Sequence, residues 1–173
     1  MDGPRNFCLP EVSHAFVNIT PGQNLLLRAL FLGVMDTALE TRYRLRNEDE
    51  VVGYARKIGS RSHFYSRDQF WWSGIKIDHN KVDECVGLYD LDKRMLYEWD
   101  IVEYCLEERR DRIGTFLWSS KRKEFCIVDL DEPSLEIPLE VDGLQLFQPK
   151  DLRFKAYLFQ NPDLMAELGV DDE

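Results

Sequence analysis

Apolar positions in the first part of the chain recur at the spacing of an α-helix. Thr20–Gln23 combines a hydroxyl cap, a proline and a glutamine in the order of a capping box with proline at the first helical position. The apolar stripe that follows recurs every three or four positions, at Leu27, Phe31, Val34 and Ala38. This pattern predicts a helix over residues 20–45, and three arginines at its end would oppose the negative helix terminus.

Two further segments begin with residues that commonly cap helices. Asn47 and Glu50 have the types and spacing of a capping box, which predicts a helix over residues 48–58. Ser66 and Gln69 repeat the pairing and predict a third helix. Residues 1–80 are therefore predicted to form a small helical module.

The pattern changes to short β-rich runs after residue 84. Turn-forming clusters separate these runs, which cover residues 101–106, 113–118, 124–130, 144–147 and 154–159. No helix-length crossover lies between them, so an antiparallel barrel or sandwich is favoured over a parallel sheet. Asn161 followed by Pro162 predicts a short C-terminal helix. The predicted fold class is α+β, with a helical module over residues 1–80 and a small antiparallel β-barrel over residues 81–173.

Charge is unevenly distributed over these two parts. The whole chain carries −10 from 22 basic and 32 acidic residues. Residues 1–80 hold 10 basic and 9 acidic side chains, and residues 81–173 hold 12 and 23, so the second part carries −11. An acidic surface repels nucleic-acid phosphates, which places any nucleic-acid role in the first part. Maintenance of solubility is the simpler explanation of the acidic half.

Cysteine spacing and hydropathy exclude several classes of protein. The four cysteines are separated by 77, 20 and 21 positions with no C-x-x-C pair, which favours buried free thiols over a metal site or a cofactor. The longest apolar run is far shorter than the roughly 20 residues that cross a bilayer. The first ten residues lack the apolar core of a signal peptide. We therefore expect a cytoplasmic protein without a membrane segment.

Catalytic motifs are missing from the sequence. It contains no G-x-S-x-G, H-E-x-x-H, P-loop or G-x-G-x-x-G pattern. Adjacent acidic residues occur in turns and at strand edges, where solvated carboxylates are ordinary. The sequence predicts a protein that is not an enzyme and has no catalytic residues.

Basic and aromatic side chains supply candidate binding residues. Residues 41–67 carry a local charge of +4. The candidate residues are Arg42, Arg44, Arg46, Arg56, Lys57, Arg61, Arg67 and the nearby Trp71. If they gather on one face, they could hold phosphates and stack a base. The same arginines could instead cap helix ends or pair with the acidic half.

Three adjacent aromatic residues occur at positions 70–72. One helix face cannot bury all three, so at least one is expected to meet the barrel or another chain. Residues 66–84 also have the order of a helix-turn-helix, with a glycine between two predicted short helices.

Two segments, in the same order along the chain as in the family pattern, resemble the YopX family of phage and prophage proteins. Residues 86–102, VGLYDLDKRMLYEWDIV, resemble the family pattern T-G-L-x-D-x-x-G-x-x-I-Y-E-G-D-I-V, and residues 154–165, FKAYLFQNPDLM, resemble its closing V-I-G-N-I-Y-E-N-P-E-L-L. The signature positions, expected to be structural, are Gly87, Leu88, Asp90, Tyr97, Glu98, Asp100, Ile101, Val102, Asn161 and Pro162. The resemblance covers about residues 84–168 and implies an SH3-like barrel in a bacterial host cell, without a settled biochemical activity.

The sequence departs from the YopX pattern at several positions. Arg94 stands near a usual turn glycine, Trp99 replaces the glycine of Y-E-G-D, and Ala156-Tyr157 replaces I-G. The family's opening strand, of the type F-R-A-W-D, is not found in residues 1–80. Residues 23–80 have a weaker similarity to small helical phage proteins.

Three functional hypotheses from different classes follow. The favoured one is a non-catalytic accessory protein that binds a host or phage protein, or a second copy of itself, and it predicts exposed aromatic side chains. The second is a DNA-binding regulator that uses residues 66–84, and it predicts a basic helix face. The third is an acidic nucleic-acid mimic that inhibits a host protein, and it predicts a continuous carboxylate stripe.

Overall fold

The computed structural model describes residues 40–60, 62–106 and 109–171, and this part of the chain is dominated by antiparallel strands. Its strands are β1 (Glu40–Asn47), β2 (Glu50–Ile58), β3 (Ser62–Ser66), β4 (Lys81–Tyr89), β5 (Met95–Tyr97), β6 (Asp100–Leu106), β7 (Arg109–Ser119), β8 (Glu124–Asp129), β9 (Glu136–Pro138), β10 (Glu140–Val141), β11 (Leu144–Gln145) and β12 (Leu152–Tyr157). The helical turns are the 3₁₀ segments η1 (Pro149–Asp151) and η2 (Leu158–Gln160) and the α-helix α2 (Pro162–Leu168).

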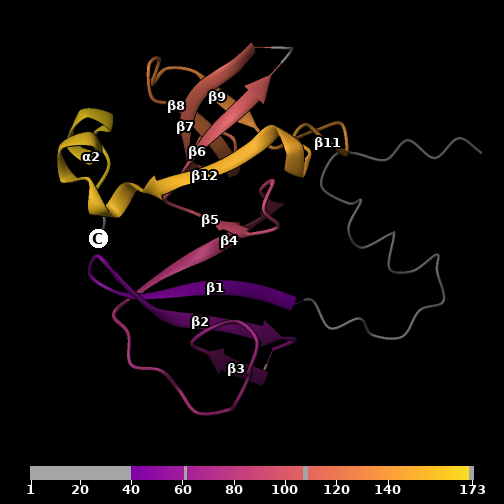
Figure 1. Cartoon of the computed structure of the whole chain (residues 1–173), viewed down its shortest axis with the longest axis vertical. Coiled ribbons are helices and arrows are strands. Elements are labelled where there is room, and N and C mark those ends of the chain that lie inside the picture. The colour runs from indigo at the N-terminus through magenta and orange to yellow at the C-terminus, as the bar shows by residue number, and fades with distance from the viewer. Residues whose placement is uncertain (1–39, 61, 107–108, 172–173) are drawn as a thin grey trace, which may run out of the picture. The chain divides into compact units, whose positions relative to one another are not determined.

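The first sheet has the strand order β3-β2-β1-β4-β5, and Figure 1 shows β1, β2 and β3 side by side. Arg42, Arg44 and Arg46 occupy β1, where a helix end was predicted. That prediction is wrong from residue 40 onward, because β1 alternates its arginines with Tyr43 and Leu45 at the two-residue period of a strand. The rest of that predicted helix lies outside the described residues.

The helix predicted over residues 48–58 is also wrong. Asn47 pairs with Glu50 across the turn of the β1–β2 hairpin, and Glu48 in that turn has a left-handed φ of 52°. The pair therefore has the composition of a capping box but closes a hairpin. With strands over most of residues 40–66, the described part of the chain does not support a helical module.

Residues 66–84 do not form the predicted third helix or the helix-turn-helix. Residues 67–80 form a loop, and the next residues belong to β4, a strand that pairs with β1. The boundary predicted between residues 80 and 81 thus falls between strands of the same sheet. We call residues 67–80 the aromatic loop.

The second sheet has the order β12-β6-β7-β8-β9. The runs predicted over residues 101–106, 113–118 and 124–130 correspond to β6, β7 and β8. The predicted C-terminal helix is confirmed: Pro162 is its first residue, and it ends at Gly169 in the left-handed conformation. No described helix is both long and apolar enough to span a bilayer.

The larger apolar core lies on the second sheet and includes residues from both of its edge strands, β12 and β9. Its fully buried members are Leu88, Leu96, Val102, Tyr104, Phe116, Ile127, Ile137, Phe147 and Leu152. Leu88 belongs to β4, so the first sheet contributes to this core as well. A smaller cluster of Ile101, Leu117 and Leu158 packs against side chains of α2.

We expect Gly114→Ala to destabilise the fold by about 1–3 kcal/mol. A Cβ at this position would lie 2.4 Å from Cγ2 of the fully buried Ile127 and 2.9 Å from the backbone carbonyl oxygen of Val128. Gly74→Ala is the matched control, because no atom lies within 4 Å of its Cβ position. Urea denaturation of both variants measures the difference, and equal midpoints would contradict the close packing at Gly114.

Candidate functional site

Two of the predicted phosphate-binding arginines lie in a buried ion-pair network. Arg44 Nε donates to Asp83 Oδ2 at 2.6 Å, and Arg44 Nη1 makes a short contact with Asp100 Oδ1. Arg46 Nε lies 2.9 Å from both Asp83 oxygens. All four side chains are at most 1% exposed, and we call them the arginine cluster.

Aromatic rings complete the surroundings of the arginine cluster. The Arg44 guanidinium lies 4.7 Å from the Tyr157 ring centroid and 5.0 Å from that of Phe159, and the Arg46 guanidinium lies 3.9 Å from Phe159. Burial raises the pKa of Asp100, and the charge of Arg44 acts against that rise. The cluster therefore joins the first sheet to the turn before β6 and to the end of β12, and neither arginine is accessible to a phosphate.

The structure does not bring the other predicted binding residues into one basic patch. Arg42 pairs with Glu40 at 2.7 Å at the part-exposed start of β1. Arg56 lies between the rings of Phe64 and Trp72, at 5.2 and 4.7 Å from their centroids. Lys57 is partly buried, Arg67 is exposed, and Arg61 lies outside the described residues.

Trp71 is a predicted binding residue that the structure leaves strongly exposed. Trp71 and Phe70 are each 84% exposed, and Ile75 in the same loop is 79% exposed. Asp68 Oδ1 accepts the backbone N–H groups of Phe70 and Trp71 at 2.9 and 3.1 Å. These hydrogen bonds lower the pKa of the Asp68 carboxyl. A groove of about 750 Å³ lies beside the loop and is lined partly by Trp71 and Ile75.

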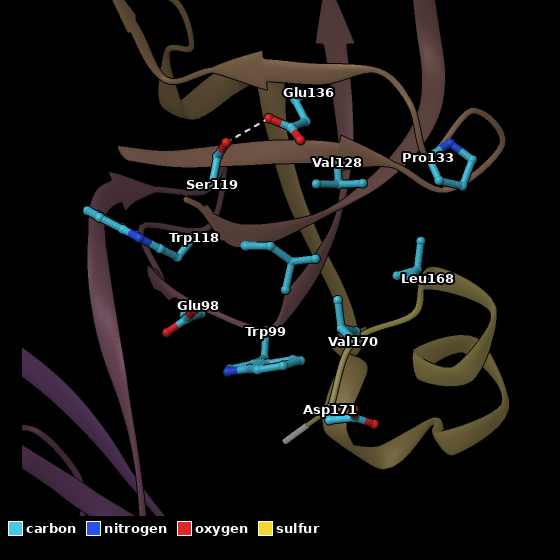
Figure 2. Close-up of a pocket in the computed structure, with 11 residues that line it drawn as sticks. Glu98, Trp99, Trp118, Ser119, Val128, Pro133, Glu136, Leu168, Val170 and Asp171 are labelled. Carbon is cyan, nitrogen blue, oxygen red and sulfur yellow. Dashed lines mark hydrogen bonds between the residues drawn. The ribbon is translucent and has the colours of Figure 1, made fainter. Parts of the chain in front are cut away.

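A second pocket, of about 350 Å³, lies between β7, the strands beside it and the residues that follow α2. Figure 2 shows Trp99 beside this pocket with Glu98, Glu136 and Asp171, whereas the Trp118 side chain points away from the other side chains drawn. Ser119 donates to Glu136 at 2.7 Å, which orients that carboxylate. We call this site the acidic tryptophan pocket.

The sequence analysis did not identify the acidic tryptophan pocket as a site. Glu98 was expected to be structural, and Trp99 was noted only as a departure from a glycine pattern. Trp99 has a φ of 69°, in the left-handed region that favours glycine. The signal that could have indicated this pocket was Trp99 itself, a large aromatic residue where the YopX pattern has a glycine.

The residues that carry the resemblance to the YopX pattern lie in turns and in the core of the described part of the chain. Asp90 is buried, and its carboxylate accepts the N–H groups of Asp92 and Arg94 in the turn and of Phe154 in β12. Asp100 accepts the N–H of Tyr97 at 2.9 Å.

The remaining signature residues shape the core and the turns. Leu88, Tyr97, Ile101 and Val102 are buried. Gly87 has a φ of 81°, and the Asn161 side chain donates to the Tyr157 carbonyl at 2.6 Å. Glu98 differs from the others, because its half-buried carboxylate faces a pocket.

Cysteines and acidic side chains form no metal site within the described ranges. Cys85, Cys105 and Cys126 are free thiols, and burial raises the pKa of Cys126 to about 11 and that of Cys85 as well. A thiol with a raised pKa is a weak nucleophile at neutral pH.

No family model, no curated protein and no solved structure matches the chain. Function is therefore inferred from the surfaces of the described residues, the aromatic loop and the acidic tryptophan pocket among them.

Proposed function

We propose that the protein is a non-catalytic accessory module that binds another protein through the aromatic loop. The observation that carries this proposal is the exposure of Phe70 and Trp71, each at 84%. Large aromatic side chains are enriched among the residues that dominate binding energy at protein interfaces. Leaving two of them in water side by side, with Ile75 nearby, is what a contact surface requires.

The backbone around these side chains is held in place. Tyr65 and Ser73 exchange both backbone hydrogen bonds, at 2.8 and 2.9 Å, across the base of the loop. Ile77 reaches the place where a Cβ of Gly53 would stand, so the loop packs closely on β2. Trp72 turns inward against Arg56 and donates its indole N–H to the Gln69 carbonyl. A pre-organised loop lowers the entropy cost of association.

The loop's charge favours a protein partner over a nucleic acid. Arg67 and Lys76 are balanced by Asp68 and Asp78, so residues 67–80 present no excess of positive charge. Binding to nucleic acid depends mainly on cationic contacts with phosphates. We infer that the partner offers an apolar pocket for aromatic side chains; the nucleic-acid-mimic hypothesis stays a prediction.

Backbone geometry supports the proposal that the chain is YopX-like. The two glycines that follow the aspartate of the family pattern align with Lys93 and Trp99, whose φ values are 63° and 69°. Both positions thus have the conformation that glycine adopts most readily. A phage or prophage setting in the bacterial cytoplasm is part of this proposal.

Replacing both Phe70 and Trp71 with serine is expected to abolish capture of the partner while the fold is retained, because both side chains are almost free of contacts. Immobilised wild-type protein and variants would be exposed to bacterial lysate treated with nuclease, and captured proteins would be identified and then tested as purified pairs. Leu144→Ser is the matched control, since Leu144 is 71% exposed on β11 outside the loop. A reconstituted pair whose affinity falls by about 100-fold in the double variant, and not in the control, supports the proposal. Equal binding by all three proteins would contradict it.

A further inference from the structure

Arg56 lies on β2, with aromatic rings close to its guanidinium. Figure 1 shows β2 between β1 and β3, and the Cα partners of Arg56 across these two ladders are Arg42 and Phe64. The guanidinium carbon lies 5.2 Å from the Phe64 ring centroid and 4.7 Å from that of Trp72. Two ring contacts of this kind restrict the positions that the guanidinium can take.

No carboxylate of the described residues neutralises this guanidinium. Arg56 takes part in none of the salt bridges among them, and its Nε is a buried donor without a hydrogen-bond acceptor. Glu40, which lies two positions before Arg42 on β1, is bonded to Arg42 at 2.7 Å. Arg44, in contrast, has the buried carboxylate of Asp83. A buried donor that lacks a partner is rare in native proteins and requires an explanation.

The missing counter-charge makes Arg56 a binding group for an anion. A guanidinium that is partly withdrawn from water attracts a carboxylate more strongly than a fully exposed one does. Arg56 as a whole is only partly buried, so other atoms of its side chain stay accessible. The guanidinium occupies the neighbouring faces of Phe64 and Trp72, so neither ring offers that face for stacking a nucleobase. A protein carboxylate therefore fits this site better than a nucleic acid does.

We propose, building on the proposed function, that Arg56 binds the carboxylate of an aspartate or glutamate on the partner that docks on the aromatic loop. Trp72, which contacts Arg56, follows Trp71 in the chain, and consecutive Cα atoms lie about 3.8 Å apart. A partner bound at the loop thus has Arg56 within reach of a neighbouring side chain. Among partners with an apolar pocket, Arg56 then favours those that carry an acidic residue beside it.

The first test uses the full-length wild-type protein. Sodium acetate or acetamide is added at constant ionic strength and neutral pH, and NMR follows the Nε–H signal of Arg56 and the indole N–H signal of Trp72. Acetate is expected to shift both signals in a saturable way, at a concentration at least about tenfold below that needed for the Nε–H of the exposed Arg67. Acetamide has a similar shape without the charge and is expected to shift neither. Equal responses of Arg56 and Arg67 to acetate, or equal effects of acetate and acetamide, would overturn the proposal.

Variants assign the acetate effect to Arg56. Arg56→Gln is expected to abolish the acetate-dependent shift of the Trp72 indole signal, and Arg56→Lys, which keeps the charge, is expected to retain a weaker shift. Arg67→Gln is the matched control, because it removes an exposed arginine of the aromatic loop, and the shift is expected to stay unchanged. A Trp72 shift that persisted in Arg56→Gln would overturn the assignment.

Two oligomers of equal negative charge distinguish protein carboxylates from nucleic-acid phosphates. One is a peptide of alternating glutamate and glycine, and the other is an oligothymidine. The peptide is expected to shift the Arg56 signal at the lower concentration, because stacking on Phe64 and Trp72 is blocked by the guanidinium. The reverse order would overturn the proposal in favour of a nucleic acid.

A purified complex with the captured partner separates this proposal from the proposed function. Arg56→Gln is expected to lower the affinity about tenfold and to reduce its dependence on salt, because one ion pair is lost. Unchanged affinity and salt dependence in Arg56→Gln, with binding lost in the double variant of Phe70 and Trp71, would overturn the present proposal alone. Equal binding by that double variant would contradict the proposed function, and the acetate titration would still decide whether Arg56 binds a carboxylate.

Discussion

Asp83→Ala is expected to lower the free energy of unfolding by about 3–5 kcal/mol, the range found when one partner of a buried ion pair is removed. Asp83 accepts hydrogen bonds from Arg44 at 2.6 Å and from Arg46 at 2.9 Å, and all three side chains are at most 1% exposed. The substitution would remove the Asp83 carboxylate from Arg46 and leave Arg44 with the Asp100 carboxylate and the Glu98 carbonyl. Two guanidinium groups cannot be rehydrated there without opening the contact between β1 and β12.

Urea denaturation at neutral pH measures this loss, and Glu84→Ala is the matched control. Glu84 is the next residue on β4, an exposed carboxylate on the opposite face of the same strand. Its replacement is expected to change stability by no more than about 0.5 kcal/mol. Adding Arg46→Met to Asp83→Ala is expected to recover part of the loss, because it removes a buried cation that has lost the Asp83 carboxylate. Equal stability of the Asp83 and Glu84 variants would show that the arginine cluster does not hold the sheets together.

Short β-rich runs bounded by turn-forming residues made the second sheet predictable. In β8 the residues Cys126 and Ile127 are buried, and the turn before this strand is rich in serine and lysine. Local signals of this kind depend on neighbouring residues alone. The same holds for α2, where Asn161 and Pro162 mark the start.

The helices predicted in the region of the first sheet were wrong because the polar residues that cap helices also form turns. Ser66 donates to Asp68, and Asp68 accepts the N–H groups of Phe70 and Trp71. These bonds close a tight turn, and Gln69 takes a φ of 66°, which no helix allows. Serine followed by glutamine three positions later is therefore compatible with both structures.

The burial of Arg44 could not be read from its own neighbourhood. Its two carboxylate partners, Asp83 and Asp100, lie 39 and 56 positions away in the chain. Without them a buried guanidinium is prohibitively unfavourable, so the sequence alone left open whether Arg44 binds phosphates, caps a helix end or pairs with the acidic half. The acidic tryptophan pocket escaped prediction for the same reason, since its walls come from β7, β9 and the residues after α2.

A second buried carboxylate, Asp129, organises the turn after β8. Arg112 Nε donates to Asp129 Oδ2 at 2.7 Å, and the Tyr104 hydroxyl makes a short hydrogen bond to the same oxygen. Asp129 Oδ1 accepts the backbone N–H groups of Asp131 and Glu132 at 3.1 and 2.9 Å. The hydrogen bond from Arg112, together with those from Tyr104 and Glu132, lowers the pKa of Asp129 to about 2, although burial acts in the opposite direction.

Asp129→Ala is expected to cost about 3 kcal/mol at pH 7, because it leaves the buried Tyr104 hydroxyl without its acceptor and the turn without its cap. The cost should depend on pH. A carboxyl whose pKa falls from 3.8 to about 2 on folding stabilises the native state above pH 3.8, and this contribution is lost as the pH falls from about 4 toward 2. Urea midpoints of wild type and variant are therefore expected to converge over that interval. Asp131→Ala, an exposed carboxylate in the same turn, should show only a small difference from wild type. A difference between wild type and Asp129→Ala that stayed constant from pH 7 to pH 2 would mean that the ionised carboxylate is not what stabilises this turn.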